Sequence, residues 1–288
     1  MDANATPLWK ASVTLEKARA PRAAALIELT PPAPQAVLIA EDPFGPDATV
    51  EALYANPPDA RFLSDLVGAS VSAAPLPDQD WIKAGKEGLP PVRAGRFFVY
   101  GAHAAGEVPA GVIPIRIEAG LAFGTGHHET TALCLAALSD LARENRRAPR
   151  TLDLGCGSGI LAIAAAKLWR RPVLAADIDP VAVAVARENA RANSVAPLLR
   201  AYVADGLAHP ALRGPHALIL ANILASPLTR LAPALSAALA PGGIAVLSGL
   251  LGSQEDLVLS FYRANGLTLR RRYRRGPWSA LVLTRRQR

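Results

Sequence analysis

A strand-to-helix turn with three alternating glycines constrains this chain more than any other segment. Residues 151–162 read TLDLGCGSGILA, in which an apolar run leads into Gly155, Gly157 and Gly159 and a helix-forming run follows. Glycine has no Cβ, so a ligand can lie against the bare backbone of such a turn. The free amides of a helix that begins at Ser158 would favour a ligand carboxylate or phosphate. The segment therefore predicts a nucleotide-binding α/β unit.

Two classes of enzyme use such a turn. Residues 157–162 fit the G-x-G-x-x-A pattern of dinucleotide-binding dehydrogenases, and Asp177 ends the next apolar stretch, where it could accept hydrogen bonds from ribose hydroxyls. Asp153 favours the other class, because a carboxylate is unfavourable beside a pyrophosphate but suits an amino group and a sulfonium. The spacing over residues 153–159 resembles the first motif of Rossmann-like S-adenosylmethionine-dependent methyltransferases, with a dehydrogenase as the competing interpretation.

Composition indicates a globular protein. A length of 288 residues allows one large domain plus a small one, and 51% hydrophobic with 19% charged residues excludes a disordered chain. There is no run of eighteen apolar residues, and the N-terminal MDANATPLWK lacks the apolar core of a secretory signal. We therefore expect a cytoplasmic protein without membrane contact. Cys134 and Cys156 are the only cysteines, and we expect neither a disulfide framework nor a metal site.

The positive charge of the chain suggests a polyanionic neighbour. The net charge is +7 and the sequence pI is near 9.8, which points to RNA, a ribonucleoprotein or a membrane surface. Eight arginines gather near the end of the chain: Arg270, Arg271, Arg272, Arg274, Arg275, Arg285, Arg286 and Arg288. Such a cluster can equally be an edge strand whose charges block pairing with other chains. We slightly favour proximity to RNA.

Residues 1–75 are expected to form a small separate domain. Their hydrophobic periodicity predicts the order β-α-β-β-α-β, which is typical of a ferredoxin-like sandwich. The predicted strands are 9–16, 36–40, 49–54 and 71–76, and the predicted helices are 21–29 and 60–67. No residue there has a catalytic context, so we expect a substrate-recognition domain. A linker over residues 76–95, rich in proline and glycine and anchored by Trp81, is expected to follow.

Residues 96–288 are expected to form the second domain, which begins with strands over 96–100 and 112–118. From residue 151 strands and helices alternate, which predicts a Rossmann-like α/β fold with a mostly parallel sheet and helices on both faces. The predicted strands are 151–154, 173–177, 199–204, 217–222 and 243–248, and the predicted helices are 158–169, 180–193, 227–239 and 253–265. Segments 267–273 and 279–284 predict an antiparallel C-terminal hairpin, which again favours a methyltransferase.

Two further segments are candidates for the site. Residues 123–131 read FGTGHHETT and precede an apolar helix predicted over 132–141. They could form a lid over the cofactor, or a loop capped by Thr130 or Thr131 with exposed histidines. Asn222 ends the fourth strand of the alternating series, where ligands of such sheets bind, so it could face the reacting atoms or be a turn residue.

The motifs together resemble a known family. GLAFGTGHHETTALC, LDLGCGSGILAIAAAKL, DIDPVAVAVARENARAN and NILASPL occur in this order and resemble the ribosomal protein L11 methyltransferase (PrmA) family. The segment DWIKAGKEGLPPVRAGRFFVYGAH is also similar to that family's linker. The resemblance covers about residues 75–288, and the N-terminal domain only by its architecture. Glu129 departs from the family pattern, because many relatives carry proline or a small residue there.

The resemblance implies S-adenosylmethionine as the cofactor and assigns its contacts. The implied contacts are Phe123, Gly124, Thr125, Thr131, Asp153, Gly155, Gly157, Asp177, Asp205 and Asn222. Asp177 would hold the ribose, Gly155 would lie under the methionine portion, and Asp205 would lie near the adenine edge. Asp179 is expected instead to cap the helix that begins at Pro180.

The resemblance also implies transfer of methyl groups to α-amino and lysine ε-amino groups of a large-subunit ribosomal protein. The acceptor amine must be neutral, which costs roughly 3 kcal/mol more for lysine than for an α-amino group at neutral pH. Asn222 is expected to orient the amine, and His127 and His128 are weaker candidates. Two alternatives stay open: a lysine methyltransferase of a non-ribosomal protein, and a non-catalytic RNA- or ribosome-binding factor with a vestigial cofactor fold. We expect a monomer.

Overall fold

The computed structural model describes residues 9–28, 30–32, 34, 36–41, 45–75, 91–117, 129–144, 148 and 150–286 of the chain. The chain divides into two compact units, Met1–Lys86 and Glu87–Arg288. Each unit contains a hydrophobic core of its own. Residues 76–90 of the predicted linker, Trp81 included, lie outside the described residues, so that the proposed linker and its anchor stay a prediction.

The small unit has the predicted β-α-β-β-α-β order. Its elements are β1 (Trp9–Glu16), α1 (Ala20–Glu28), β2 (Ala36–Glu41), β3 (Asp47–Tyr54), α2 (Ala60–Val67) and β4 (Ser72–Pro75). The antiparallel sheet has the order β2-β3-β1-β4. Every second residue of β1 and β3 faces the two helices, so that Val13 and Val50 pack with Ile27 and Leu63. The ferredoxin-like sandwich expected from the sequence is confirmed.

The other face of this small sheet is polar. Lys10 forms an ion pair of 2.9 Å with Glu51 on the neighbouring strand, and the hydroxyls of Thr14 and Thr49 lie 3.2 Å apart. These are opposed or near-opposed positions of β1 and β3, and their side chains are partly or fully solvent-exposed. The small unit therefore presents a hydrophilic surface on the side away from its helices.

The large unit is built on a seven-stranded sheet with the order β10-β9-β8-β11-β12-β14-β13. The strands are β8 (Thr151–Leu154), β9 (Val173–Asp177), β10 (Leu199–Val203), β11 (His216–Asn222), β12 (Leu239–Leu251), β13 (Leu267–Arg275) and β14 (Trp278–Arg285). The first five strands in this order are parallel, and β14 and β13 are antiparallel additions at one edge. The predicted parallel sheet with an antiparallel C-terminal hairpin is confirmed.

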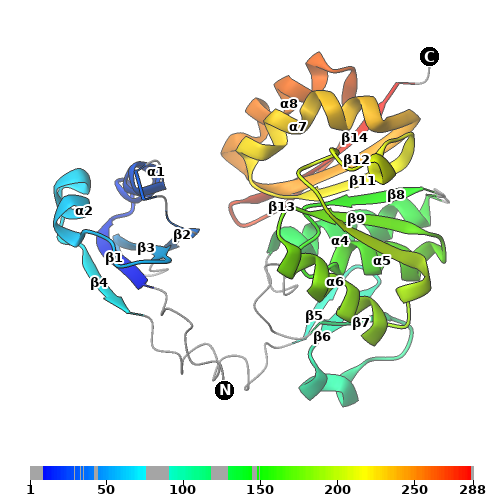
Figure 1. Ribbon diagram of the computed structural model, residues 1–288, viewed down its shortest axis with the longest axis horizontal. Helices are drawn as coiled ribbons and strands as arrows, with labels where there is room; N and C mark the ends of the chain where they lie inside the picture. The colour runs from blue at the N-terminus through cyan, green and yellow to red at the C-terminus, as the bar shows by residue number, and fades with distance from the viewer. Residues whose placement is uncertain are drawn as a thin grey trace. The chain divides into compact units, whose positions relative to one another are not determined.

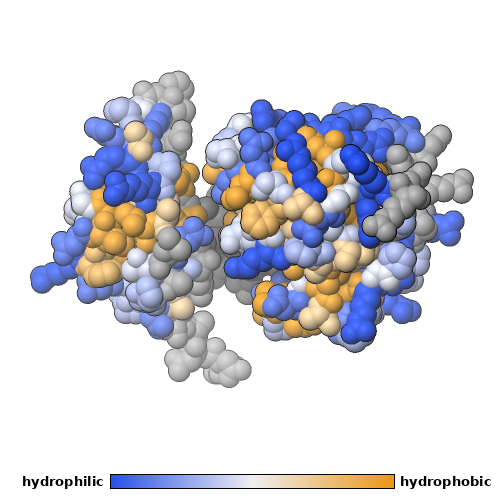
Figure 2. Space-filling view, turned by 90° about the horizontal axis from the view of Figure 1, so that it is seen from above, coloured by the Kyte–Doolittle hydropathy of each residue, from blue (hydrophilic) through white to orange (hydrophobic). Residues whose placement is uncertain are grey.

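Helices cover both faces of this sheet (Figure 1). One face carries α4 (Glu129–Arg143), α5 (Ile160–Trp169) and α6 (Pro180–Ala192), and the other carries α7 (Ala225–Ala238) and α8 (Glu255–Ala264). Alternate residues of β11 supply the two cores, because Leu218 and Leu220 face one layer while Ile219 and Ala221 face the other. Seen from the side of α7 and α8, the surface mixes hydrophilic and hydrophobic residues (Figure 2).

Some element boundaries differ from the sequence prediction. The helix expected from residue 158 begins at Ile160, because Gly159 has a left-handed φ of +78° and serves as its N-cap. Strand β12 starts directly at Leu239, where α7 ends, and so begins four residues before the predicted strand 243–248. Short 3-10 helices occur at Ala102–Glu107, Ala196–Leu198, Pro210–Leu212 and Gly252–Gln254.

A three-stranded sheet precedes the main fold. Its strands are β5 (Val92–Ala94), β6 (Phe97–Tyr100) and β7 (Ile113–Arg116), of which β5 falls within the predicted linker range. Phe97 and Ile115 are fully buried in the core formed with α4 and α5. The Asn193 side chain, just after α6, accepts from the amide of Arg116 at 2.9 Å and donates to its carbonyl at 2.6 Å. These contacts attach the three-stranded sheet to the rest of the large unit.

The burial of the two cysteines and the lengths of the helices bear on two expectations from the sequence. Cys134 and Cys156 are free thiols inside the core, and burial raises the pKa of Cys134 to about 12. Among the described residues, every helix is too short or too polar to cross a lipid bilayer.

Candidate active site

The candidate site lies where the direction of the sheet connections reverses. The chain leaves β8 through α5 on one face and leaves β11 through α7 on the other. Crevices at the carboxyl ends of such neighbouring strands are the usual ligand sites of open α/β sheets. Asp153 of β8 is paired with Leu220 of β11, and Asn222 ends β11 two residues later. The glycine turn and Asn222 are therefore neighbours, as the sequence predicted from strand order alone.

The glycine turn adopts left-handed backbone conformations that favour glycine. The φ values of Gly155, Gly157 and Gly159 are +66°, +52° and +78°. Their surroundings differ, however. A Cβ on Gly159 would collide with Ala186 of α6, and one on Gly155 would overlap the side chain of Ile223. The expectation that all three glycines expose bare backbone to a ligand is therefore wrong for Gly159, which permits close packing of α5 against α6.

Asp177 fixes the turn to the end of β9. Its Oδ2 accepts a hydrogen bond of 2.8 Å from the amide of Gly157, and its Oδ1 accepts one of 3.1 Å from the amide of Asp179. A carboxylate has about four acceptor positions, so capacity is left for hydroxyl donors. Asp179 caps α6 by accepting from the amide of Val181 at 2.8 Å, and Pro180 occupies the first turn, as the sequence predicted.

Asp153 is a buried carboxylate with one free oxygen. It is 1% exposed, and its Oδ2 accepts a hydrogen bond of 2.9 Å from the amide of Ala162 in α5. Its Oδ1 is buried and has no partner among the described residues. Burial, with a smaller contribution from the charge of Asp177, raises the pKa of Asp153 to about 7. This environment is unfavourable for an anion unless a cation arrives beside it.

Asn222 is joined to the first turn of α4. Its Nδ2 donates to Oγ1 of the fully buried Thr131 at 3.2 Å, across 91 positions of sequence. Because Nδ2 is engaged in this way, Oδ1 is the end of the amide that is left, and it is buried without a partner among the described residues. The sequence identified both residues, but the bond between them depends on packing. Ser248, paired with Asn222 in the sheet, donates to the carbonyl of Ser279 at 2.8 Å.

The remaining predicted contacts are less defined. Phe123, Gly124 and Thr125, with His127 and His128, lie outside the described residues. Asp205 follows β10 and is exposed, and its carboxylate forms no hydrogen bond or ion pair with any other described residue. Sequence reasoning missed three exposed apolar residues that lie at the ends of β9, β10 and β11 or within two residues of them. They are Ile178, Val203 and Leu224, which are 68%, 50% and 62% exposed.

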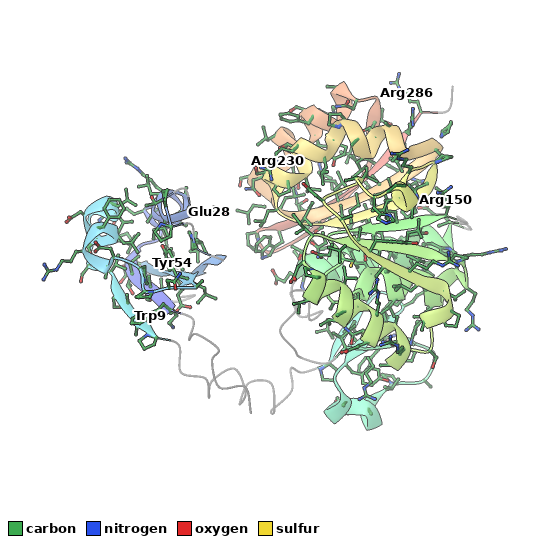
Figure 3. The ribbon with its side chains drawn as sticks, in the orientation of Figure 1. Trp9, Glu28, Tyr54, Arg150, Arg230 and Arg286 are labelled. Atoms are coloured by element: carbon green, nitrogen blue, oxygen red, sulfur yellow. The ribbon has the colours of Figure 1, made fainter. Side chains whose placement is uncertain are left out.

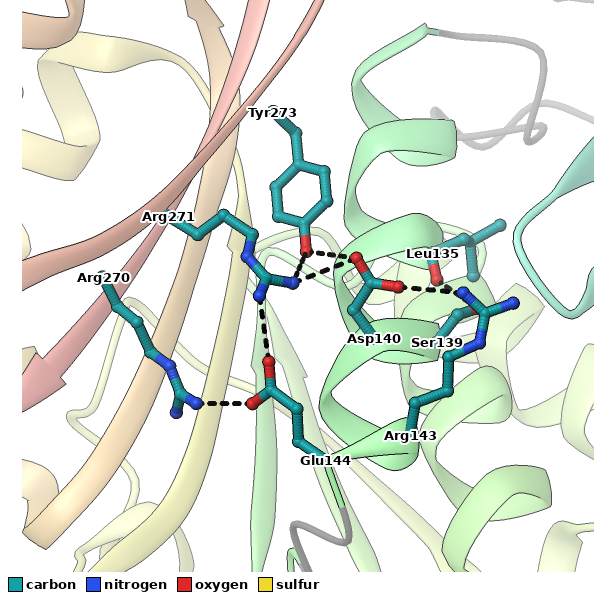
Figure 4. Close-up of polar contacts among 8 residues, drawn as sticks. All are labelled: Leu135, Ser139, Asp140, Arg143, Glu144, Arg270, Arg271 and Tyr273. Carbon is teal, nitrogen blue, oxygen red and sulfur yellow. Dashed lines mark hydrogen bonds and ion pairs between the residues drawn. The ribbon is translucent and has the colours of Figure 1, made fainter.

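The five arginines of β13 form ion pairs within the protein. On the α4 side, Arg270 and Arg271 pair with Glu144, and Arg271 and Tyr273 also contact Asp140 (Figure 4). On the α8 side, Glu255 is 2% exposed and pairs with Arg272 at 2.9 Å and Arg274 at 2.7 Å. Arg275 lies 3.9 Å from Glu129. These pairings support the edge-strand interpretation of the cluster over a surface for RNA.

The site fits a ligand with a cationic part, hydroxyl groups and an apolar ring. Asp153 and Asn222 each hold a buried acceptor oxygen without a partner among the described residues, and polar groups of this kind are rarely left unpaired unless a ligand or water completes them. Asp177 can accept from two vicinal hydroxyls, and the exposed Ile178 beside it offers apolar surface. These are the groups that S-adenosylmethionine would need. Among the described residues no cluster of three or more metal-binding side chains occurs.

Comparison with known proteins agrees with this chemistry. A family model described as ribosomal protein L11 methyltransferase (PrmA) matches residues 44–286. The chain is 51% identical over 211 residues to the ribosomal protein L11 methyltransferase of Brucella abortus (strain S19), which covers 73% of this chain and 74% of that protein. It is also 51% identical over 233 residues to the enzyme of the same description from Mesorhizobium japonicum, with 78% and 79% covered.

A solved structure supports the same assignment. The ribosomal protein L11 methylase of Lactobacillus delbrueckii subsp. bulgaricus superimposes with a TM-score of 0.62 at 30% sequence identity, covering 69% of this chain and all of that one. The motifs, the sheet topology and the matched length agree, and they exclude the dehydrogenase interpretation of the glycine turn. The chain therefore belongs to the ribosomal protein L11 methyltransferase (PrmA) family of S-adenosylmethionine-dependent enzymes.

Proposed function

We propose that the chain transfers methyl groups from S-adenosylmethionine to α-amino and lysine ε-amino groups of ribosomal protein L11. Its relatives are named for methylation of ribosomal protein L11, and we take the substrate from them. The observation in the structure that carries the proposal is the buried, unpartnered Oδ1 of Asn222 at the carboxyl end of β11. An amide oxygen in this position can accept a hydrogen bond from an incoming amine, which a purely structural asparagine would not need.

The cofactor side of the site is assigned to the glycine turn and its neighbours. Bound S-adenosylmethionine supplies an activated methyl group on a sulfonium. We assign the ribose hydroxyls to Asp177 and the cationic part of the methionine to Asp153 and the turn at Gly155 and Gly157. The adenine is assigned to the exposed apolar surface at Ile178, with Asp205 at its edge. Phe123, Gly124 and Thr125 are proposed to cover the cofactor.

The acceptor side depends on Asn222 and Thr131. The hydroxyl of Thr131 holds Nδ2 of Asn222 at 3.2 Å, so Oδ1 is turned toward the site rather than the amino end. Oδ1 can then accept an N–H of the substrate amine and align its lone pair for in-line attack. Exclusion of water around these buried groups lowers the pKa of an amine, which helps lysine lose its proton. The two side chains act by alignment, and neither serves as a base.

We also propose the oligomeric state and location of the enzyme and a role for the small unit. We propose that the enzyme is monomeric and cytoplasmic, and that it works close to ribosomal RNA when its substrate is on the ribosome. The small unit is proposed to recognise the protein substrate, because its open sheet face is hydrophilic at Lys10, Glu51, Thr14 and Thr49. This surface suits a polar protein partner better than an apolar ligand.

Substitution of Asn222 tests the proposed function. Labelled S-adenosylmethionine is incubated with the enzyme and total ribosomal proteins, and label is expected in one large-subunit protein. Asn222→Ala should lower kcat by about 10²- to 10³-fold, which is typical for loss of one transition-state hydrogen bond. Thr131→Val should lower it less, and Thr131→Ser should retain most of it because the hydroxyl is kept.

Three results would contradict the proposal. Label in a protein that is not ribosomal would favour a lysine methyltransferase with another target. Full turnover of Asn222→Ala on the ribosomal substrate would remove the role of the amide. A chain that fails to bind S-adenosylmethionine in calorimetry would instead be a binding factor, although the unpartnered acceptors of Asp153 and Asn222 argue against a vestigial site.

A further inference from the structure

Strand β12 contains a bulge beside the end of β11. From Leu247 to Leu250 it advances by three residues, whereas its partner β14 advances by only two. Within this bulge Gly249 has a left-handed φ of +83°. On its other side β12 stays in register with β11 up to the pair of Ser248 with Asn222. Bulges are common beside active sites, where they redirect side chains or end strand pairing, and this one lies next to the candidate acceptor amide.

Gly249 packs against the backbone of Ile223, the residue that follows Asn222. A Cβ on Gly249 would collide with the carbonyl oxygen of Ile223, and it would lie 2.7 Å from the carbonyl carbon and 2.9 Å from the amide nitrogen of that residue. The amide of Ile223 also donates a hydrogen bond of 3.1 Å to the carbonyl of Ser248. Position 249 therefore requires glycine, both for its φ and for the space that the end of β11 occupies.

The side chain of Ile223 extends from this contact to the glycine turn of the cofactor site. Its Cγ2 occupies the place that a Cβ on Gly155 would take. Ile223 thus lies between two glycines with left-handed φ, Gly155 and Gly249. Side chains occupy the layers between the sheet and the helices on both of its faces (Figure 3), and Ala221, the residue before Asn222, is fully buried. The end of β11 therefore has little room to shift.

We infer that the bulge at Ser248 and Gly249 positions Asn222 relative to the cofactor turn, an inference that rests on the proposed methyl transfer. In-line attack requires close alignment of the amine with the methyl group, and a shift of about 1 Å far from the chemistry can lower the rate about 10²-fold. The backbone that follows Asn222 rests on Gly249, and the side chain of the same segment rests on Gly155. Gly249 is thus a positioning residue that acts through Ile223.

The test compares two glycines with the same backbone conformation. Gly266, between α8 and β13, has a φ of +82°, but no described atom beyond its chain neighbours lies within 4 Å of the place of a Cβ. Gly249→Ala and Gly266→Ala should therefore both lower stability through strain, and only Gly249→Ala should also displace Ile223. Turnover of ribosomal protein L11 is measured with the full chain at saturating labelled S-adenosylmethionine, and denaturant unfolding gives the folded fraction.

The kinetic constants separate positioning from a purely structural role. Gly249→Ala should lower kcat of the folded enzyme about 10²-fold and change KM for the ribosomal protein less than about threefold, because alignment and not binding is lost. Gly266→Ala should keep kcat of the folded enzyme within about twofold. Equal kcat values in the two variants, or a loss in Gly249→Ala that is found only in KM, would overturn the inference.

If Gly249→Ala does not fold, substitutions of Ile223 supply the comparison. Valine keeps the Cγ2 that lies over Gly155, and alanine removes it, so kcat of Ile223→Ala should be at least about 10-fold below that of Ile223→Val. Equal kcat values in these two variants would overturn the inference. Failure of the proposed function is distinguishable, because the parent enzyme itself would then leave the ribosomal protein unlabelled.

Discussion

At the residue scale, Asp153 shows how a ligand site can cost stability. Its carboxylate is buried with one unpartnered oxygen, and its pKa is raised to about 7 from an unfolded value near ~3.9. A raised pKa means that the folded protein prefers the neutral acid. The free energy of unfolding therefore loses a contribution as pH rises from ~3.9 through about 7. A cationic ligand would reverse this preference by stabilising the carboxylate.

We predict that Asp153→Asn stabilises the ligand-free enzyme and weakens cofactor binding. At pH 8 the variant should unfold with a free energy about 1–3 kcal/mol higher, because no charge is then buried. The advantage should disappear below about pH 4, where Asp153 becomes neutral in the unfolded state as well. Affinity for S-adenosylmethionine at pH 8 should fall roughly 10- to 100-fold, which is about 1.4 to 2.7 kcal/mol. Denaturant unfolding and calorimetry measure the two effects.

Asp179→Asn is the control for this prediction. Asp179 is exposed and caps α6, and asparagine caps a helix about as well as aspartate, so neither stability nor cofactor affinity should change much. A variant of Asp153 that is less stable at pH 8 would show that the carboxylate has a partner in the folded protein. Unchanged cofactor affinity would remove Asp153 from the binding site.

The residues of the site could be named from the sequence, but their contacts could not. Asp177 and Asn222 follow from strand ends, because a parallel sheet brings its carboxyl ends to one edge. The hydrogen bond between Asn222 and Thr131 could not be predicted, since it depends on how α4 packs over the sheet. The packing role of Gly159 was hidden for the same reason: periodicity carries no information about which helix approaches a turn.

At the element scale, the C-terminal hairpin is held by carboxylates from helices on both faces of the sheet. Glu255, at the start of α8, is the most buried of them, and its carboxylate also accepts from the hydroxyl of Ser279 at 2.7 Å. The Arg274 guanidinium, helped by Ser279 and Arg272, lowers the pKa of Glu255 to about 2. A lowered pKa stabilises the fold above ~4.3, and this contribution is lost as pH falls toward 2.

We predict that Glu255→Gln lowers the free energy of unfolding by about 1–3 kcal/mol at pH 7. The neutral amide cannot balance Arg272 and Arg274, and those guanidinium groups are 41% and 62% exposed, which limits the loss. The difference from the parent should shrink below pH 4. Arg143→Ala, which breaks an exposed pair with Asp140, should cost less than about 1 kcal/mol. Equal losses in the two variants would contradict a special role for Glu255.

Elements were predictable where the pattern is local. Alternating apolar residues and proline or glycine breaks predicted β8 and β9 with the bounds that the structure has, and the α2 bounds as well. Pairing between distant elements was not predictable. The arginines of β13 looked like a surface for RNA because their partners, Asp140, Glu144 and Glu255, are up to 131 positions away in sequence.

At the scale of the whole molecule, each of the two units has hydrophobic core residues of its own. The core of the small unit is drawn from residues 11–71, and the two cores of the large unit are drawn from residues 94–283, without shared members. Apolar burial is the main favourable term in folding, so each unit has its own source of stability. The proposed cofactor contacts all belong to the large unit, whereas recognition of a protein substrate is proposed for the small one.

We predict that a chain of residues 87–288 binds S-adenosylmethionine with a Kd within about threefold of that of the full enzyme. Its kcat/KM for the ribosomal protein should fall by more than about 100-fold, because the binding energy of the small unit for the substrate is lost.

In the full chain, Val50→Asp buries a charge in the core of the small unit, where Val50 is 1% exposed. It should abolish the unfolding transition of the small unit while keeping that of the large unit and the affinity for the cofactor. Loss of cofactor binding in either variant would show instead that the large unit depends on the small one for its fold.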